Sequence, residues 1–342
     1  MLVTKQPILR RFWYAVMKSS RLDEGPQPFT LLGENIVLWK RADGTPAAAR
    51  DRCCHRTAKL SKGWVEGDNI VCGYHGWQYD CTGACVKIPQ FTSEKIPPGA
   101  RIDAFRCQEK FGYVWVALDE PLAPILDTPE EGNPQYRRIH QFDEEWKTGA
   151  LRLMENSFDT AHFSFVHKGT FGQFGKPKPE FFEIRETDYG FEAETIIHIN
   201  NPPFSHRITG STEPTTKRHF LNQWHMPFTR RLGIVYPSGI EHTIFTCATP
   251  IDDHRIQIIQ WLYRNDTEED CPAALLNEWD VKVVAEDKEI LESVVADAPV
   301  DVTLRLEEHM PSDRPGLIMR KHLLALLRKY GETEQLSGEI VR

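Results

Sequence analysis

The chain has 342 residues, of which 40% are hydrophobic and 26% are charged; this is the composition of a folded globular protein, so an intrinsically disordered chain is excluded. The formal net charge of −8 repels phosphate groups, and the basic residues form no dense block, which argues against a nucleic-acid-binding protein. No apolar run is long enough to span a membrane, and the first residues lack the apolar segment of a signal peptide, so we expect a cytoplasmic protein without a membrane anchor.

The first third of the chain is predicted to form a small all-β domain. Short apolar or alternating runs at residues 36–39, 70–72 and 113–118 are separated by glycine and proline residues, as in strands that are joined by turns. Residues 119–134 are rich in proline and in acidic residues, which is typical of a linker. We therefore expect the first domain to cover residues 1–118.

Two pairs of cysteine and histidine residues in this domain have the spacing of a metal site. Cys53 and His55 are separated by one residue, and Cys72 and His75 are separated by two. Two thiolates and two imidazoles can hold a zinc ion or a Rieske cluster, in which the thiolates bind one iron and the imidazoles bind the other. A Cys-x-His pair is uncommon in structural zinc sites, so the spacing favours the cluster.

The sequences around these four residues resemble the cluster-binding loops of the Rieske domain. The resemblance is carried by CCHR at residues 53–56, CGYHGWQYD at 72–80 and GACVKIP at 83–89. It implies that a [2Fe-2S] cluster is held by Cys53, His55, Cys72 and His75. The family usually has proline after each cysteine ligand, whereas this chain has Cys54 and Gly73. The use of Cys54 as an alternative ligand therefore stays open.

Residues 135–342 are predicted to form a second domain. Its predicted elements are, in chain order, a helix at residues 151–167, an antiparallel sheet with one buried face over 180–263, a long amphipathic helix at 275–295 and a further helix at 317–330. This domain therefore combines a sheet with helices.

The helix predicted at residues 151–167 carries the polar residues that a metal site needs. Asn156, Asp159 and His162 are three residues apart and lie on one face of a regular helix. A single histidine at such a position is usually a core residue, but two histidines with an acid and an amide indicate a metal site. His167 follows His162 by five residues, so the two side chains converge only if the helix loosens or ends between them.

The spacing Asn-x-x-Asp-x-x-His-x-x-x-x-His is similar to the mononuclear-iron motif of the Rieske oxygenases. This resemblance implies that His162 and His167 bind iron. It also implies that Asp159 connects the iron to the electron donor, and that Asn156 positions the ligands without binding the metal. Non-heme iron is commonly held by two histidines and one carboxylate, so one carboxylate is still missing.

Helix periodicity selects Asp287 as the missing carboxylate. The apolar stripe of the long amphipathic helix lacks one turn between residues 283–284 and 290–291, and Asp287 occupies that turn. A buried carboxylate without a partner is costly, so a metal is its natural partner. Glu286 and Glu289 are expected to be ordinary exposed acids.

The resemblance covers most of the chain and is weakest between residues 170 and 265, where we expect the substrate pocket. It implies an α+β fold, in which an N-terminal all-β Rieske domain precedes a helix-grip catalytic domain with an antiparallel sheet at residues 135–342. It implies a homotrimer, in which the cluster of one subunit serves the iron of the next. The implied cofactors are a [2Fe-2S] Rieske cluster and mononuclear Fe(II), with O2 as cosubstrate and electrons from NAD(P)H through a flavin and iron–sulfur reductase or a ferredoxin.

Two longer segments indicate which of the family's reactions to expect. RDRCCHRTAKL at residues 50–60 and YHGWQYDCTGAC at 74–85 resemble the N-demethylases of purine alkaloids and the aryl-ether O-demethylases. We therefore expect monooxygenation, as hydroxylation or oxidative O- or N-demethylation, of a small aromatic or N-heterocyclic substrate. The alternatives are cis-dihydroxylation of an aromatic ring, a Rieske electron carrier without oxygenase chemistry, and a zinc-stabilised binding protein.

Overall fold

The structure is a computed structural model that describes residues 1–90, 95–173 and 178–339. The chain divides into two compact units, one formed by Leu9–Ile125 and the other by Met1–Ile8 together with Leu126–Arg342. None of the helices within the described residues is both long and apolar enough to cross a membrane.

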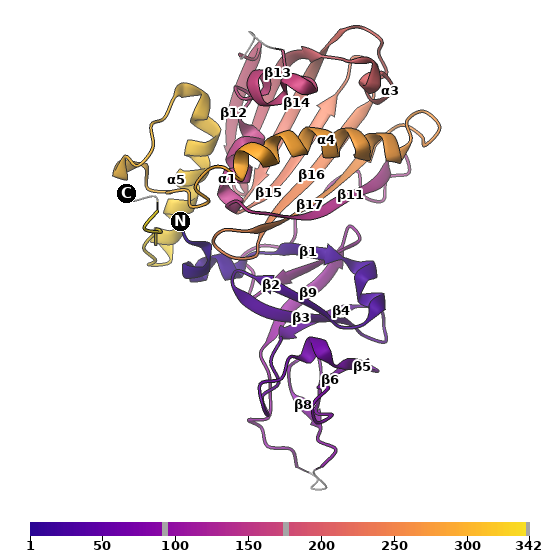
Figure 1. Ribbon diagram of the computed structural model, residues 1–342, viewed down its shortest axis with the longest axis vertical. Helices are drawn as coiled ribbons and strands as arrows, with labels where there is room; N and C mark the ends of the chain where they lie inside the picture. Colours follow the sequence, from indigo (N-terminus) through magenta and orange to yellow (C-terminus); the bar gives the residue numbers. More distant parts are fainter. Residues whose placement is uncertain (91–94, 174–177, 340–342) are drawn as a thin grey trace. The chain divides into compact units, whose positions relative to one another are not determined.

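The unit Leu9–Ile125 consists of two antiparallel sheets (Figure 1). The larger sheet has the strand order β1-β10-β9-β4-β3-β2, and the smaller sheet has the order β5-β6-β7-β8. The strands are β1 (Tyr14–Lys18), β2 (Gln27–Leu31), β3 (Glu34–Lys40), β4 (Pro46–Arg50), β5 (Trp64–Glu66), β6 (Asn69–Val71), β7 (Gln78–Tyr79), β8 (Cys85–Lys87), β9 (Ala104–Lys110) and β10 (Tyr113–Ala117). The apolar runs of β3 and β10 are buried, as the sequence predicted for strands that pack into a core.

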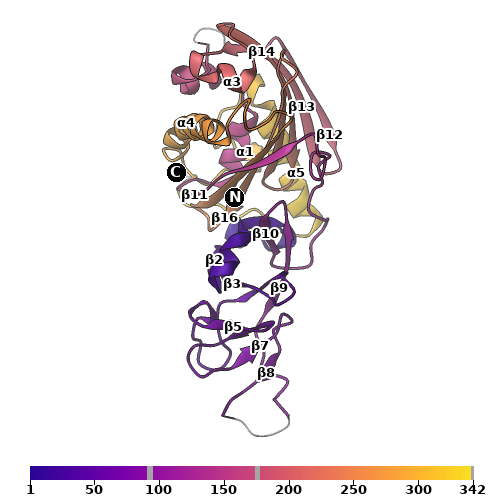
Figure 2. The same cartoon turned by 90° about the vertical axis from the view of Figure 1, so that its right-hand side faces the viewer.

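The second unit is built on a seven-stranded antiparallel sheet with the order β11-β17-β16-β15-β14-β13-β12 (Figures 1 and 2). Its strands are β11 (Arg137–Trp146), β12 (Phe181–Thr187), β13 (Gly190–Asn200), β14 (Thr215–His225), β15 (Thr229–Val235), β16 (Glu241–Pro250) and β17 (Ile256–Arg264). Along β14, exposed and buried residues alternate, because one face of the sheet is covered and the other meets solvent.

The helices of this unit are α1 (Ala150–Phe158), α2 (Phe163–Val166), α3 (His206–Thr209), α4 (Ala273–Leu291) and α5 (Arg314–Lys329), with a short 3-10 helix η5 (His167–Gly169) after α2. Helix α4 lies across one face of the sheet and contacts α1, α2 and β11 (Figures 1 and 2). This confirms the predicted α+β fold, with an all-β first unit and an antiparallel sheet that holds a long helix in the second.

The helix that we predicted at residues 151–167 is interrupted earlier than expected. Asp159 has an extended backbone, with φ −82° and ψ 128°, and it ends α1. Its carboxylate accepts hydrogen bonds from the N–H groups of Ala161 at 2.7 Å and His162 at 3.3 Å. A short acidic side chain that binds nearby N–H groups competes with the helix. A first break therefore lies before His162, and α2 then ends at Val166, between His162 and His167, as we expected.

The first eight residues pack with the second unit, although we expected residues 1–118 to form one domain. The amino group of Met1 forms an ion pair with Asp297, and both groups are almost fully buried. A buried charge is stable only when it is paired, so this contact ties the start of the chain to the second unit.

The segment that we expected to be a linker, residues 119–134, is divided between the two units after Ile125. Glu130 is only 6% exposed; it forms an ion pair with Arg231 and accepts a hydrogen bond from Thr243 at 3.0 Å. These contacts attach the second half of the segment to the sheet of the second unit.

Candidate metal sites

The first predicted site lies on two loops of the unit Leu9–Ile125. One loop follows β4 and carries Cys53 and His55, and the other joins β6 to β7 and carries Cys72 and His75. The N–H of Gly76 donates to the carbonyl of Cys72 at 2.9 Å and closes the second loop. Gly76 has a φ of +72°, a conformation that glycine adopts at low cost, so the sequence favours this tight turn.

The thiols of this site are buried, and the imidazoles lie nearer the surface. Cys53 and Cys72 are 2% and 1% exposed, and the two thiols interact with each other. His55 is exposed and His75 is half-buried, and the centroids of their rings are 4.6 Å apart. The ring of His55 also stacks on Trp77 at 4.6 Å with an interplanar angle of 3°.

This arrangement fits a two-iron cluster better than a single zinc ion. One ion needs all its ligand atoms close together, and in the part of the chain that the structure describes these four side chains form no such group within 4.8 Å. A cluster separates its two thiolates from its two imidazoles. Burial raises the pKa of Cys72, while the N–H groups of Tyr74 and His75 lower it, so this thiol needs a metal to be deprotonated at neutral pH.

Cys54, the alternative ligand, is exposed, whereas Cys53 is buried beside Cys72. The sulfur of Cys54 lies 3.3 Å from the hydroxyl of Tyr79, and that of Cys53 lies 3.0 Å from the same hydroxyl. The burial of Cys53 together with Cys72 favours Cys53 as the ligand.

The second predicted site brings together three side chains from three different elements. His162 precedes α2, His167 opens η5 and Asp287 lies in the last turns of α4. The Nε2 atoms of the two histidines are 3.2 Å apart, and Asp287 Oδ1 lies 3.5 Å from Nε2 of His162 and 3.3 Å from Nε2 of His167. This triad is the one group of three potential ligands within 4.8 Å of one another among the described residues. The donor set fits mononuclear non-heme iron.

The charges of this site are strongly coupled. Burial raises the pKa of Asp287, but His162 and His167 outweigh burial and hold that pKa far below its usual value. Burial lowers the pKa of His162, but Asp159 and Asp287 raise it to about 9. A metal that binds Nε2 of His162 must therefore displace a proton at neutral pH.

Asp159 and Asn156 contact the predicted ligands. Asp159 Oδ2 lies 3.2 Å from Nδ1 of His162, so the other ring nitrogen is free to face the metal. Burial raises the pKa of Asp159, but hydrogen bonds from His162 and from the N–H of Ala161 lower it overall, which keeps the group ionised. Asn156 donates to Asp287 Oδ1 at 2.9 Å and so orients the carboxylate ligand.

Glu286 is not the ordinary exposed acid that we expected. Its side chain is 21% exposed, and Oε2 lies 3.0 Å from Nδ1 of His167 and 2.7 Å from the hydroxyl of Thr170. Glu286 therefore does for His167 what Asp159 does for His162. A metal-bound histidine almost always has a partner for its second nitrogen, so a partner for His167 could have been expected, but the sequence does not show that this partner is Glu286. Glu289 is exposed, as expected.

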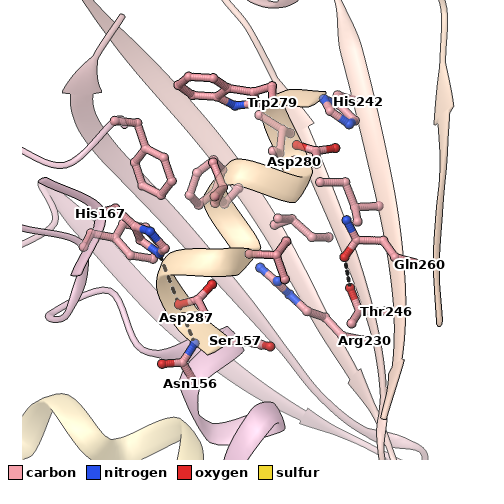
Figure 3. A pocket seen from close by; sticks show the side chains of 18 of the residues that line it. Asn156, Ser157, His167, Arg230, His242, Thr246, Gln260, Trp279, Asp280 and Asp287 are labelled. Carbon is pink, nitrogen blue, oxygen red and sulfur yellow. Dashed lines mark hydrogen bonds and ion pairs between the residues drawn. The ribbon is translucent and has the colours of Figure 1, made fainter. Parts of the chain in front are cut away.

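A cavity of about 130 Å³ lies between α4 and the sheet, with the triad at one end (Figure 3). The strands that line it fall between residues 170 and 265, where we expected the pocket. Much of the lining is apolar and includes Phe171, Phe220, Leu232 and Val283. Such a lining suits a small, flat, apolar molecule.

The end of the cavity away from the triad is polar. In Figure 3, His242, Asp280 and Gln260 lie apart from the triad residues His167 and Asp287. Burial raises the pKa of Asp280 to about 6, although Gln141 donates a hydrogen bond to it. Arg218 of β14 also lines the cavity. We did not identify these polar residues from the sequence, although Arg218 falls at a buried position in the alternation of β14.

Comparison with known proteins points to one family. Residues 12–105 match the Rieske [2Fe-2S] domain, and residues 146–329 match the vanillate O-demethylase oxygenase C-terminal domain. Methylxanthine N1-demethylase NdmA of Pseudomonas putida is 32% identical over 343 residues, which cover 96% of this chain and 92% of the relative. The 5,5'-dehydrodivanillate O-demethylase oxygenase subunit of Sphingobium sp. is 32% identical over 284 residues, which cover 75% of this chain and 58% of the relative. A structure of Pseudomonas putida CBB5 NdmA is similar with a TM-score of 0.80 and 30% identity, covering 96% of this chain and 93% of that one.

Proposed function

The chain belongs to the Rieske non-heme iron oxygenases, and we propose that this monooxygenase removes a methyl group from the oxygen or nitrogen of a small aromatic or N-heterocyclic substrate. Membership of the family brings a Rieske [2Fe-2S] cluster and a mononuclear iron as cofactors and O2 as cosubstrate. The observation that carries the proposal is the His-His-Asp triad at one end of a largely apolar cavity.

We assign the cofactor ligands from the geometry described above. The cluster would be held by Cys53, His55, Cys72 and His75, and the iron by His162, His167 and Asp287. When bound, the cluster supplies single electrons, and the iron activates dioxygen next to the substrate. The residues of the chain supply ligand orientation, water exclusion and substrate binding.

The residues of the chain orient the two histidine ligands of the iron and exclude water from the cavity beside it. Asp159 and Glu286 each hold one ring nitrogen of a histidine ligand, so that the Nε2 atoms of His162 and His167 point toward the same space. With three protein ligands, the iron would keep coordination positions that dioxygen could take. The apolar side chains around the cavity keep bulk water from the methyl group that is to be oxidised.

Demethylation by monooxygenation is chemically balanced. One oxygen atom of O2 enters a C–H bond of the methyl group, and the other leaves as water after two electrons and two protons are supplied. The hydroxymethyl group that results loses formaldehyde, and the proton returns to the oxygen or nitrogen of the product. The N-demethylase and O-demethylase activities in the relatives' names support this reaction over ring hydroxylation.

We further propose that electrons come from NAD(P)H through a flavin and iron–sulfur reductase or a ferredoxin, and that the chain acts as a homotrimer. Both features follow from the resemblance to the oxygenase family, and the need for NAD(P)H favours a cytoplasmic location. Head-to-tail contacts can close into a ring, and a ring of three subunits would allow the cluster of one chain to serve the iron of the next.

Oxygen uptake tests the proposed reaction. The holoenzyme with a suitable reductase is supplied with NADH and a panel of methoxyaromatics and N-methylated heterocycles. We expect formaldehyde in a one-to-one ratio with the O2 consumed on the best substrates. A cis-diol product without formaldehyde would contradict demethylation and favour dihydroxylation. A cluster that is reduced and reoxidised without oxygen entering any substrate would favour an electron carrier.

Metal analysis separates the remaining alternatives. An oxygenase holds about three irons per chain, a carrier holds two, and a zinc-stabilised binding protein is colourless. A brown protein with three irons is the expected result.

A further inference from the structure

The cavity is lined by an arginine, Arg218, that has no direct ion-pair partner among the described residues. Arg218 is 5% exposed, and its Nε and Nη2 atoms are buried without a hydrogen-bond partner in the described parts of the chain. No ion pair joins its guanidinium to any described carboxylate, and its nearest aromatic neighbours are Tyr236 at 5.2 Å and Phe171 at 5.7 Å. Burial lowers the pKa of Arg218, but a guanidinium stays protonated in proteins. A buried charge of this kind normally has an anionic partner.

A second hydrogen-bond donor in the cavity lining also lacks a partner. Nδ1 of His242 lies 3.3 Å from Nη1 of Arg264, its cross-strand neighbour. A guanidinium can only donate, so Nδ1 must be the acceptor. Burial and the charges of Arg264 and Arg218 hold the pKa of His242 well below its usual value, so the ring is neutral and its proton is on Nε2. That Nε2–H is buried and has no acceptor among the described residues.

The nearby carboxylate of Asp280 does not accept a hydrogen bond from either of these donors. Asp280 accepts a hydrogen bond from Gln141, and its charge acts on Arg218 and raises the pKa of that guanidinium, but the two described side chains form no direct ion pair. The other arginine of the cavity, Arg230, differs from Arg218 because its Nε donates to the side-chain oxygen of Asn222 at 2.9 Å. The guanidinium of Arg218 and the Nε2–H of His242 therefore need acceptors that the described chain does not supply.

We propose that the substrate carries an organic oxyanion, a carboxylate or a sulfonate, which binds Arg218 and the Nε2–H of His242. This inference rests on the proposed demethylase function and names its substrate class. Asp280 and Asp287 are seven residues apart on α4, so the anion site lies about 10 Å along the helix from the iron ligand. An aromatic ring fills the apolar part of the cavity, with the anion at one end and the methyl ether or methylamine at the iron.

Binding without turnover tests this inference. Calorimetry on the anaerobic holoenzyme without reductase compares 3- and 4-methoxybenzoate with the matching methoxybenzenesulfonates and methoxybenzamides. The carboxamides have nearly the shape of the carboxylates but no charge. We expect at least one anion to bind about tenfold or more tightly than its carboxamide, because hydrogen bonds to charged groups are the strong ones. The tighter class, carboxylate or sulfonate, identifies the anion.

Variants assign the preference to the residues. Arg218→Gln should remove most of the preference for the anion, whereas Lys217→Gln should keep it. Lys217 is a matched control because it lies next to Arg218 on β14 but on the outer face, where it pairs with Glu180 at 3.0 Å. Cluster absorption and iron content show whether each variant is folded. If Arg218→Gln does not fold, His242→Phe provides the second test and should weaken the preference.

Three results would overturn the inference. In the first, every carboxamide binds as tightly as its anions, and in the second, none of the probes binds. In the third, folded Arg218→Gln keeps the full preference, as it would if the anion bound the iron directly. A failure of the proposed demethylation would give a different result. In that case the anion would still bind, but no formaldehyde would be released during turnover.

Discussion

Replacing Glu286 with alanine should weaken iron binding, although Glu286 is not a ligand. The change removes the acceptor that lies 3.0 Å from Nδ1 of His167 and 2.7 Å from the hydroxyl of Thr170. The side chain of His167 is only 2% exposed, so water cannot readily replace the lost acceptor. Loss of such a partner typically reduces metal affinity about 10- to 100-fold, which corresponds to roughly 1.4 to 2.7 kcal/mol.

Anaerobic titration with Fe(II) measures this effect. The mononuclear iron is removed first with a chelator, and the absorption of the Rieske cluster reports how much protein remains folded. Glu286→Gln keeps a carbonyl oxygen at the same place, so its loss of affinity should be smaller. Glu289→Ala removes an exposed acid from the same helix and should leave the affinity unchanged.

A dissociation constant for Glu286→Ala that matches those of the wild type and Glu289→Ala would refute the reasoning. It would mean that His167 is oriented by packing alone. The stacking of its ring on Phe171, at 4.6 Å between centroids, is the contact that could do so.

Four further predictions concern the site and its assembly. Asp287→Ala should lose the mononuclear iron but keep the cluster absorption, and full iron content would show that another carboxylate is the ligand. Asp159→Ala should slow reoxidation of the reduced cluster in the presence of oxygen and substrate; a wild-type rate would remove Asp159 from the electron path. Burial raises the pKa of Asp280 from 3.8 to about 6, so its contribution to stability is present below pH 4 and is lost as the pH rises toward 6. The free energy of unfolding of Asp280→Asn, measured with urea, should therefore rise relative to that of the wild type over this pH range, by up to about 3 kcal/mol. A difference between the two proteins that stays the same at every pH would contradict the raised pKa. Co-expression of Cys72→Ser and His162→Ala, each inactive alone, should restore partial activity, whereas verified mixed trimers that stay inactive would place the electron path within one chain.

The sequence alone predicted features that depend on residues close together in the chain. The pairs Cys53/His55 and Cys72/His75 occupy short loops, so their spacing already restricts how they can bind metal. Asp287 could be selected from several acids because a helix has a fixed period, and the structure brings it within 3.5 Å of both histidines.

The break in the first helix shows where local reasoning was insufficient. Spacing alone placed Asn156, Asp159 and His162 on one helical face, because a regular helix was assumed. In the structure, the carboxylate of Asp159 binds the N–H groups that a continued helix would have used. Helix propensity cannot predict which of these competing hydrogen bonds forms, since the result depends on how the following residues pack.

Only the tertiary structure identified the residues whose partners lie far away in the sequence. Glu286 meets His167 across 119 residues, so nothing near Glu286 in the chain distinguishes it from the exposed Glu289. Arg218 and His242 lie on different strands, and their unpartnered donors become evident only when every nearby acceptor is known. Sequence periodicity determines which face of a strand or helix is buried, but it does not determine what that face meets. The contacts across the cavity are set by the folding of the sheet around α4, and those contacts determine the shape and polarity of the cavity.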